Sequence, residues 1–391
     1  MTSSRTANSL PALRRKDVVV VGGSAAGLYT AALLAAGGKR VRVLEAEERL
    51  EPAPRTLIVT HHLRGLLGRA ADASVVNEIR RFELYTDGRS ATIPLAQPDL
   101  IIERARLIRA LAEDASAAGA AIDCGRRFLS LADSRGNLSL ETESRGKRDE
   151  LRAAVIVGAD GAASRVARAA GWPALETVPL VQAIVRPPKD CYPDTVRVWF
   201  VPDDTPYFYW LIPESTERAA LGLIAEDGRD AHRCLMRFLE KRGYEPLEFQ
   251  GARIPVYSGW VPVRRAIGSG DVYLVGDAAA QVKVTTVGGV VTGFRGARGV
   301  AEAILNGGRS NELGTLRREL GLHWLIRRAL HRFQQADYSR LVDLLEGGTR
   351  KSLAEVTRDE AARLLWNVVR RQPRLALLGL RGLLLGHTRR A

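Results

Sequence analysis

Several small residues near the start of the chain have the types and spacing of a nucleotide-binding turn. They follow the apolar run Val18–Val21 and comprise Gly22, Gly23, Ser24, Ala26 and Gly27. In the pattern Gly-x-Gly-x-x-Gly, Ser24 stands where the second glycine is usual, and the small residues let backbone N–H groups approach a pyrophosphate. Glu45 ends a second apolar run, at the place where an acid accepts hydrogen bonds from a ribose. The pattern predicts an adenine dinucleotide site, and a plain packing turn is the alternative.

Two later stretches place aspartates after apolar runs typical of strands. Residues 153–171, AAVIVGADGAASRVARAAG, contain Asp160, and residues 271–277, DVYLVGD, end at Gly276 and Asp277. Together with the first turn, and in this order, they resemble the FAD enzymes that include the aromatic hydroxylases. The resemblance implies that distant stretches converge on one FAD and that Asp277 holds its ribityl chain. It also implies that Arg104, which opens a helix predicted within 101–120, contacts the phosphates or the adenosine half.

The segment 276–297, GDAAAQVKVTTVGGVVTGFRGA, narrows the resemblance to the geranylgeranyl reductases. Their loop runs from the late aspartate through lysine, proline and threonine to a glycine cluster, and Val284 stands where proline is usual. The residues at the other places are Lys283, Thr285, Thr286, Gly288 and Gly289. Residues 207–224 also resemble the family's aromatic-x-Trp-x-apolar-Pro strand, at Trp210 and Pro213. With the leucine-rich C-terminal region, the resemblance to this FixC-like family of FAD-dependent oxidoreductases spans nearly the whole chain.

Physical roles can be assigned to these residues. The pair Gly288 and Gly289 would let backbone approach a flat ring, and the helix start beyond it would stabilise negative charge on the reduced flavin. A plain helix entry is the alternative. Along a strand, Phe208 and Trp210 are expected on one face, and Tyr207 and Tyr209 on the other. We treat Phe208, Trp210 and Thr285 as candidate substrate contacts, with core packing as the alternative for Trp210.

Reduction of an isolated alkene needs hydride from flavin N5 and a proton from an acid in a dry apolar slot. Many geranylgeranyl reductases carry a Cys-Gly-Gly stretch soon after the second strand, whereas this chain has EPAPRTLIVTHHLRG there. Arg55 in that stretch is a candidate cofactor contact. His61 and His62, together with Lys283, are the candidate proton donors, although a structural or surface role is the alternative for each histidine.

Three other functions share the cofactor motifs. One is an FAD mono-oxygenase of an aromatic or specialised metabolite, and another is a membrane-docked electron carrier to quinone. Such carriers often add clustered cysteines for an iron–sulfur module, which this chain lacks. The third is a halogenase, because FYWLIP approaches the Trp-x-Trp-x-Ile-Pro signature. Halogenases, however, need a lysine after the first βαβ unit, and none occurs between Lys39 and Lys147. The reductant, NAD(P)H or ferredoxin, is left open.

Composition limits the partners. The net charge is +14 from 58 basic and 44 acidic residues, which fits attraction to an anionic surface, and a peripheral membrane contact is one candidate. No nucleic-acid motif occurs, and the arginines are spread along the chain, so nucleic acid is not expected. The three cysteines lie far apart, which favours the cytoplasm and predicts no metal site. The uncharged run 18–38 after the basic residues 14–16 resembles a signal peptide, but it divides into strand, turn and helix.

The predicted fold class is α/β, with a Rossmann-like FAD-binding domain, an antiparallel-sheet substrate domain and a helical C-terminal region. The FAD-binding domain is assigned to 16–55, 98–180 and 262–310. The substrate domain, which takes an apolar and in our interpretation prenyl molecule, is assigned to 56–97 and 181–261. Residues 232–243 are expected to form a helix across its sheet. Residues 311–391 form the C-terminal region.

Overall fold

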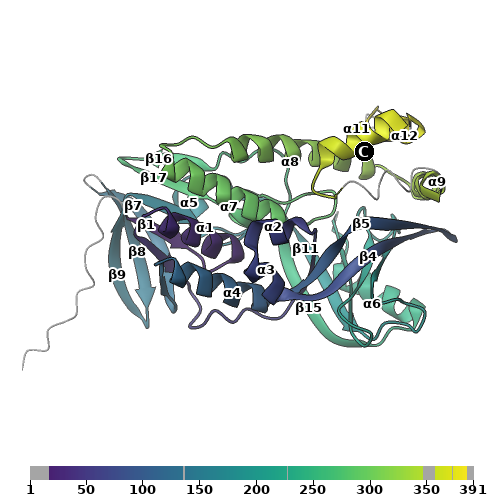
Figure 1. Ribbon diagram of the computed structural model, residues 1–391, viewed down its shortest axis with the longest axis horizontal. Helices are drawn as coiled ribbons and strands as arrows, with labels where there is room; N and C mark the ends of the chain where they lie inside the picture. Colours follow the sequence, from purple (N-terminus) through teal and green to yellow (C-terminus); the bar gives the residue numbers. More distant parts are fainter. Residues whose placement is uncertain (1–16, 135–136, 227, 347–356, 372, 385–391) are drawn as a thin grey trace, which may run out of the picture.

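The structure is a computed structural model that describes residues 17–134, 137–226, 228–346, 357–371 and 373–384. Two β-sheet layers lie side by side, and helices from the end of the chain extend along both (Figure 1). The basic residues 14–16 lie outside the described residues. So do 347–356, 372 and 385–391 of the predicted helical region.

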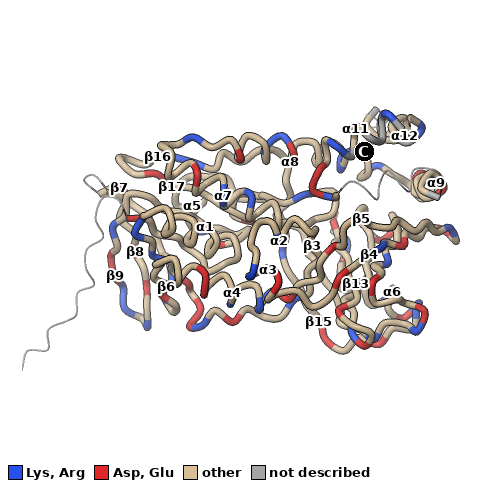
Figure 2. The backbone as a smooth tube through the Cα atoms, viewed as in Figure 1, with Lys and Arg blue, Asp and Glu red and all other residues tan. Residues whose placement is uncertain are grey.

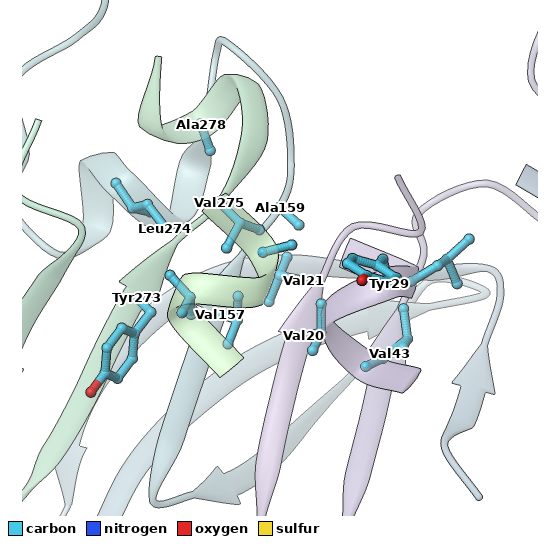
Figure 3. Close-up of a cluster of buried hydrophobic side chains, with 14 of the residues drawn as sticks. Val20, Val21, Tyr29, Val43, Val157, Ala159, Tyr273, Leu274, Val275 and Ala278 are labelled. Carbon is cyan, nitrogen blue, oxygen red and sulfur yellow. The ribbon is translucent and has the colours of Figure 1, made fainter. Parts of the chain in front are cut away.

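A parallel sheet forms the first layer. The order is β16 (Arg264–Ile267), β17 (Gly270–Leu274), β10 (Val155–Gly158), β1 (Val18–Val21), β2 (Val41–Leu44) and β6 (Ala121–Asp123), with β16 alone antiparallel. Its three central strands, β1, β10 and β17, are short, mostly apolar and largely buried, as parallel strands covered by helices must be. Figure 3 shows side chains of β1, β10 and β17 gathered in one cluster, among them Val21, Val157 and Leu274.

The turn after β1 explains why glycine stands at position 22. Parallel pairing sets Val21 opposite Gly158, so the next residues of the two strands, Gly22 and Ala159, approach each other closely. Gly22 has φ +108°, and a Cβ there would lie 2.5 Å from the carbonyl oxygen of Ala159. Any other residue would be both strained and in collision. The turn leads into α1 (Ala25–Ala36), which Ser24 caps by accepting a hydrogen bond from Gly27 N at 3.2 Å.

Further elements cover this sheet. The helices α4 (Arg104–Ala117) and α7 (Val290–Leu305) both pack against α1. A three-stranded antiparallel sheet consists of β7 (Arg126–Ser134), β8 (Asn137–Ser144) and β9 (Lys147–Ala153). The short elements are α2 (His62–Leu67), α3 (Arg69–Ser74), α5 (Arg165–Ala169) and the 3-10 helix η1 (Gly276–Ala279).

An eight-stranded, mostly antiparallel sheet forms the second layer. Its order is β15 (Pro246–Pro255), β11 (Thr177–Val185), β14 (Ala219–Ile224), β13 (Tyr209–Pro213), β12 (Thr195–Trp199), β4 (Val75–Thr86), β5 (Arg89–Glu103) and β3 (Thr56–Val59). The strands β11 to β15 agree with the antiparallel sheet predicted for the substrate domain. Residues 56–103 add three more strands, and β5 continues through the boundary predicted at residue 97. The predicted division into domains stays a prediction.

Alternation along the central strands gives this sheet two different faces. Tyr209 and Leu211 of β13 pack with Phe238 and Leu235 of α6 (Ala231–Arg242), whereas Trp210 and Ile212 point to the opposite face. The expectation for Tyr207 was wrong, because this residue packs with Trp210 and not with Tyr209. The strand begins only at Tyr209, and Tyr207 N is bonded to the Thr205 hydroxyl at 3.0 Å, so the alternation does not extend back to Tyr207.

Helices at the end of the chain close the second face. They are α8 (Asn311–Leu330), α9 (Gln335–Glu346), α11 (Ala361–Arg371) and α12 (Pro373–Leu384). α9 packs against β4 and β5, while α8 contacts α7, α11 and α12. In Figure 1, α6 lies on the outer side of the large sheet, and α9, α11 and α12 lie on the other. None of the helices in the described ranges has the length and apolar character to cross a bilayer.

Candidate functional site

A cavity of about 600 Å³ lies between the two sheets and beneath α8 and α9. The carboxyl ends of the parallel strands contribute one end, and the second face of the large sheet contributes a wall. Eight predicted cofactor residues line it: Ser24, Ala26, Arg55, Arg104, Gly276, Asp277, Gly288 and Gly289. The predicted substrate residues Phe208, Trp210 and Thr285 line it as well. Sequence motifs that are far apart along the chain therefore meet at one cavity.

Strand pairing brings Arg55 and Arg104 together at one end of the cavity. Arg55 precedes β3 and Arg104 follows β5, and Thr56 of β3 pairs with Glu103 of β5. Arg104 N donates to the carbonyl of Arg55 at 3.2 Å. Asp277, in η1 just after β17, completes the cluster, and its charge acts on Arg55. Arg55 and Arg104 are far apart in the sequence, but the pairing of β3 with β5 places them next to each other.

These three charges are not fully satisfied by the protein. Burial raises the pKa of Asp277, and Arg55 and Arg104 oppose the shift. Burial also lowers the pKa of Arg55, and Arg104 adds to the effect. The Nε of Arg55 is buried without a partner, and no donor within the described residues bonds the Asp277 carboxylate. Buried polar groups without partners are uncommon, so this end of the cavity has the character of a polar binding site.

The glycine turn and Glu45 lie just outside the cavity lining. Gly23 N donates to Glu45 Oε2 at 2.7 Å, and Glu47 N donates to Glu45 Oε1 at 2.9 Å. A Cβ at Gly27 would lie 2.3 Å from the carbonyl oxygen of Gly22. The turn is therefore held in a tight form, with Glu45 oriented toward it, and only Ser24, Ala25 and Ala26 reach the cavity.

The loop after Asp277 folds back on itself beside the cavity. Lys283 N donates to the carbonyl of Gly288 at 3.2 Å, and Gly289 caps the start of α7. A Cβ on Gly289 would lie 3.3 Å from Asp277 Oδ1. Val287, between them, has φ +52°, a costly conformation for a β-branched residue. Thr285, Thr286 and the residues up to Val290 form part of the lining.

Asp160 has a different environment from Asp277. Its carboxylate accepts hydrogen bonds from Ser164 Oγ at 2.5 Å, Arg165 N at 2.7 Å and Val166 N at 3.1 Å, so it caps α5. Its neighbours Ala159 and Gly161 line the cavity, but Asp160 does not. The side chain of Asp160 shapes the loop, and a direct role in cofactor binding stays a prediction.

The three candidate proton donors lie behind the cavity wall. Lys283 is 5% exposed and forms a buried ion pair with Asp359, which also accepts a hydrogen bond from Thr60. His62 Nδ1 lies 3.7 Å from Asp359 Oδ2, and the bond to Asp359 raises the pKa of His62. Burial and the neighbouring His62 lower the pKa of His61. None of the three lines the cavity.

A buried histidine that the sequence did not single out does line the cavity. His323 of α8 is 2% exposed, and its Nδ1 lies 2.8 Å from Thr285 Oγ1. Burial, and then the charge of Lys283, lowers the pKa of His323 to about 3, so the ring is neutral at neutral pH. In the sequence, the only indication of His323 is its place on the apolar side of the amphipathic pattern of α8, and such a position ordinarily belongs to the core.

Comparison with known proteins agrees with the cofactor assignment. Residues 15–313 match the family of FAD binding domains. A geranylgeranyl bacteriochlorophyll reductase-like protein from Thermoplasma acidophilum has the same fold, with a TM-score of 0.75 and 19% identity over 93% of this chain and 98% of that one. A p-nitrophenol 4-monooxygenase from Pseudomonas putida has a TM-score of 0.61 and 18% identity, over 94% and 98%. These likenesses confirm the predicted fold class.

The residues present fit FAD. Gly22 and Gly27 allow the tight turn into α1, because a Cβ at either position would meet neighbouring backbone. The first residues of α1 line the cavity, where the N-terminus of the helix can bind a pyrophosphate. Asp277 offers a carboxylate without a protein donor, which suits sugar hydroxyl groups. Arg55 offers an unpartnered Nε–H, and Arg104 adds a second positive charge beside it.

The substitution Asp277→Asn tests this assignment. We expect FAD affinity to fall about 10- to 100-fold, because hydrogen bonds to a charged acceptor contribute about 1.5–3 kcal/mol. The apoprotein should be at least as stable as wild type, since burial disfavours the Asp277 charge. Fluorescence titration of apoprotein with FAD, with thermal unfolding of the apoprotein, measures both. Asp271→Asn, on the preceding strand β17 but paired with Arg264 at the surface, is the control. Unchanged FAD affinity in Asp277→Asn would contradict the role.

His323 predicts a pH dependence of stability. Its pKa is lower in the folded state than in the unfolded state, so the unfolded state binds the proton first as pH falls. The free energy of unfolding should therefore decrease between about pH 6.5 and pH 3, by up to about 1.4 kcal/mol per pH unit from this group. Denaturant unfolding of His323→Gln, which keeps a hydrogen-bonding group beside Thr285, should show a shallower decline. His232→Gln, at an exposed position of α6, is the control. Parallel curves for wild type and His323→Gln would refute the prediction.

Curated relatives narrow the family. Digeranylgeranylglycerophospholipid reductase 2 of Methanopyrus kandleri is 30% identical over 300 residues, which cover 71% of this chain and 73% of the relative. The chloroplastic geranylgeranyl diphosphate reductase of Oryza sativa subsp. japonica is 28% identical over 363 residues, covering 84% and 76%. The matched FAD-binding domain, the curated relatives and the shared fold all agree with the resemblance carried by the motifs around Asp277 and Trp210. The chain belongs to the geranylgeranyl reductase family of FAD-dependent oxidoreductases.

Proposed function

We propose that this oxidoreductase reduces carbon–carbon double bonds of a prenyl or other isoprenoid substrate. The observation that carries the proposal is the continuity of the cavity, because one apolar space joins Asp277 and the Gly288–Gly289 pair to the aromatic face of the large sheet. FAD, once reduced, supplies hydride from N5. An isoprenoid offers no polar group along its chain, and a wall of apolar side chains suits it.

In this proposal, the residues around Asp277 bind the cofactor. Ser24 and Ala26 flank its pyrophosphate, and Glu45 accepts hydrogen bonds from its ribose. Arg55 and Arg104 contact its phosphates or adenosine half, and Asp277 accepts hydrogen bonds from its ribityl chain. The Gly288–Gly289 pair allows backbone to approach the ring, and the start of α7 there favours negative charge.

The wall of the cavity excludes water from the reacting bond. Trp210 and Phe208 have ring centroids 6.3 Å apart, Phe208 and Phe200 are also 6.3 Å apart, and Phe200 stacks on Tyr338 at 4.5 Å. This run of rings connects the sheet to α9. It would hold an extended apolar chain and prevent competing reactions with solvent. We assign substrate contact to Phe208, Trp210 and Thr285.

The proton required by the reaction has no direct donor among the residues predicted for it. His61, His62 and Lys283 lie behind the wall, so each would act on a substrate only through an intervening group. Thr285 and His323 are the polar pair of the lining next to Lys283. Because His323 is neutral, it positions the Thr285 hydroxyl and does not itself serve as a charged acid.

Anaerobic reduction of the holoenzyme tests the reaction. The electron donor, NAD(P)H or ferredoxin, is identified by which of them reduces the flavin. We then expect a geranylgeranyl substrate to reoxidise the flavin and to gain mass in steps of two hydrogens, whereas its fully saturated analogue should have no effect. Flavin absorbance and product mass spectrometry measure the two outcomes. Substrate-dependent oxygen consumption with a hydroxylated product would contradict the proposal, as would electron transfer to quinone with no reduced isoprenoid.

We also assign a peripheral membrane contact to the last two helices of an otherwise cytoplasmic protein. Trp366 of α11 is 65% exposed, and Leu377 and Leu380 of α12 are 63% and 49% exposed. Leu377 and Leu380 are three residues apart, so they share one face of α12. Exposed arginines accompany them, and Figure 2 shows basic positions along α8 and at α11 and α12. Apolar side chains beside arginines are typical of helices that lie at an anionic lipid surface.

Flotation with lipid vesicles tests this contact. The holoenzyme should bind vesicles that contain phosphatidylglycerol more strongly than vesicles of phosphatidylcholine alone, and added salt should weaken the binding. Replacing Trp366, Leu377 and Leu380 by serine should reduce the bound fraction at least several-fold, since each loses about 1.5–3 kcal/mol of potential burial. A triple serine variant that still bound like wild type would exclude these helices as the contact.

A further inference from the structure

One buried charge in the described ranges lacks an oppositely charged neighbour. Buried Asp17 and Arg197 have partners, with Arg40 at 2.8 Å and Glu83 at 2.9 Å. Lys283 pairs with Asp359, and Asp99 pairs with Arg358. Arg327 of α8 is only 7% exposed, yet no carboxylate of the described residues lies within 4 Å of it. An unpaired charge in the protein interior is costly, so its presence calls for a binding partner.

The neighbours of Arg327 hold it in place without neutralising it. Its Nη1 donates to the carbonyl of Pro206 at 2.9 Å, and its Nη2 lies 3.1 Å from His331 Nδ1. The guanidinium carbon lies 3.6 Å from the ring centroid of Tyr207, whose hydroxyl donates to Glu226. The Glu226 carboxylate is therefore separated from Arg327 by a tyrosine on one side and by His331 on the other. The Nε of Arg327 has no partner.

Arg327 faces the cavity. It lies one helical turn after His323, and His323, Ile326, Arg327 and Leu330 all belong to the lining. The lining residues near it include Tyr207, Phe208 and Tyr338, which offer no negative charge. Across the described lining, the only carboxylate is Asp277 at the cofactor end. The other cation on the substrate side, Arg358, is paired with Asp99 and lies over the Phe82 ring at 5.0 Å.

We propose that Arg327 binds an oxyanion of the substrate, so that the isoprenoid reduced here carries a carboxylate or phosphate enclosed at the α8 end of the cavity. This inference rests on the proposed function for the nature of the apolar chain. Arginine presents a planar set of donors that suits both anions, and its fixed position on Tyr207 lowers the entropy lost on binding. In an apolar enclosure, such a charge-assisted bond is stronger than it would be at the surface. Arg327 would then select substrates by their polar end while the aromatic wall accepts the chain.

Binding to the oxidised holoenzyme tests this without turnover. The probes are geranylgeraniol, geranylgeranoic acid and geranylgeranyl phosphate, titrated by calorimetry or by the change in flavin absorbance. In wild type, we expect one or both acids to bind about 10- to 100-fold more tightly than the alcohol. The acid that binds more tightly distinguishes carboxylate from phosphate. Equal affinity of all three ligands would overturn the inference, whatever the variants do.

Variants locate the preference. Arg327→Gln should bind the alcohol as wild type does but lose the preference for the acids, and Arg327→Lys should keep part of it. Arg328→Gln removes the same charge from the next, exposed position of α8 and should change nothing. FAD content and affinity for the alcohol report whether Arg327→Gln is folded. If it does not fold, Arg327→Lys and the wild-type series decide the question. An acid preference that survives in Arg327→Gln would exclude Arg327 as its source.

The outcomes separate this inference from the proposed function. Tight binding of the acids that depends on Arg327, without any reduction of their double bonds, would refute the reductase proposal and leave the oxyanion site standing. If the enzyme instead bound the alcohol and the acids with equal affinity and reduced all of them, the oxyanion site would be refuted and the reductase proposal would stand.

Discussion

Parallel pairing of β10 with both β1 and β17 is the constraint on which the site depends. In register, Val21, Gly158 and Leu274 end three neighbouring strands at the same edge of the sheet. The glycine turn, the loop that contains Asp160 and the segment at Asp277 all begin at that edge. The backbones approach so closely that only glycine is tolerated at position 22. Ligands of open α/β sheets bind at this carboxyl edge, and here it forms one end of the cavity.

The large sheet serves the cavity because it has two unlike faces. One face is packed by α6 and supplies rigidity, while the other presents Trp210 and its aromatic neighbours to the substrate space. β3 and β5 of the same sheet also deliver Arg55 and Arg104 to the cofactor end. A single sheet therefore positions groups for both ligands, and a shift of one residue in the β3–β5 register would separate the two arginines.

The buried charged residues are of two kinds: some form ion pairs within the protein, and others face the cavity. The pair formed by Lys283 and Asp359 ties the loop after Asp277 to the segment that follows α9, and it is fully matched. Asp277, Arg55 and Arg327 face the cavity, and the Nε atoms of both arginines have no hydrogen-bond partner. Matched pairs hold the walls together, whereas unmatched charges mark where ligands supply the missing partner.

The sequence by itself determined the features that are local in the backbone. The glycine turn, the strand ahead of Asp277, the helix opened by Arg104 and the strand of Trp210 depend on short patterns, and the structure has each of them. The resemblance to geranylgeranyl reductases, carried by these motifs, identified the family correctly. Only the tertiary structure decided that Tyr207 faces the cavity, that Lys283 is buried against Asp359 and that His323 and Arg327 line the substrate space. The position of Tyr207 depends on a bend of the chain before β13, and the position of Lys283 depends on contact with a distant segment. For His323 and Arg327, the amphipathic pattern of α8 is the same whether its buried face meets a core or a cavity.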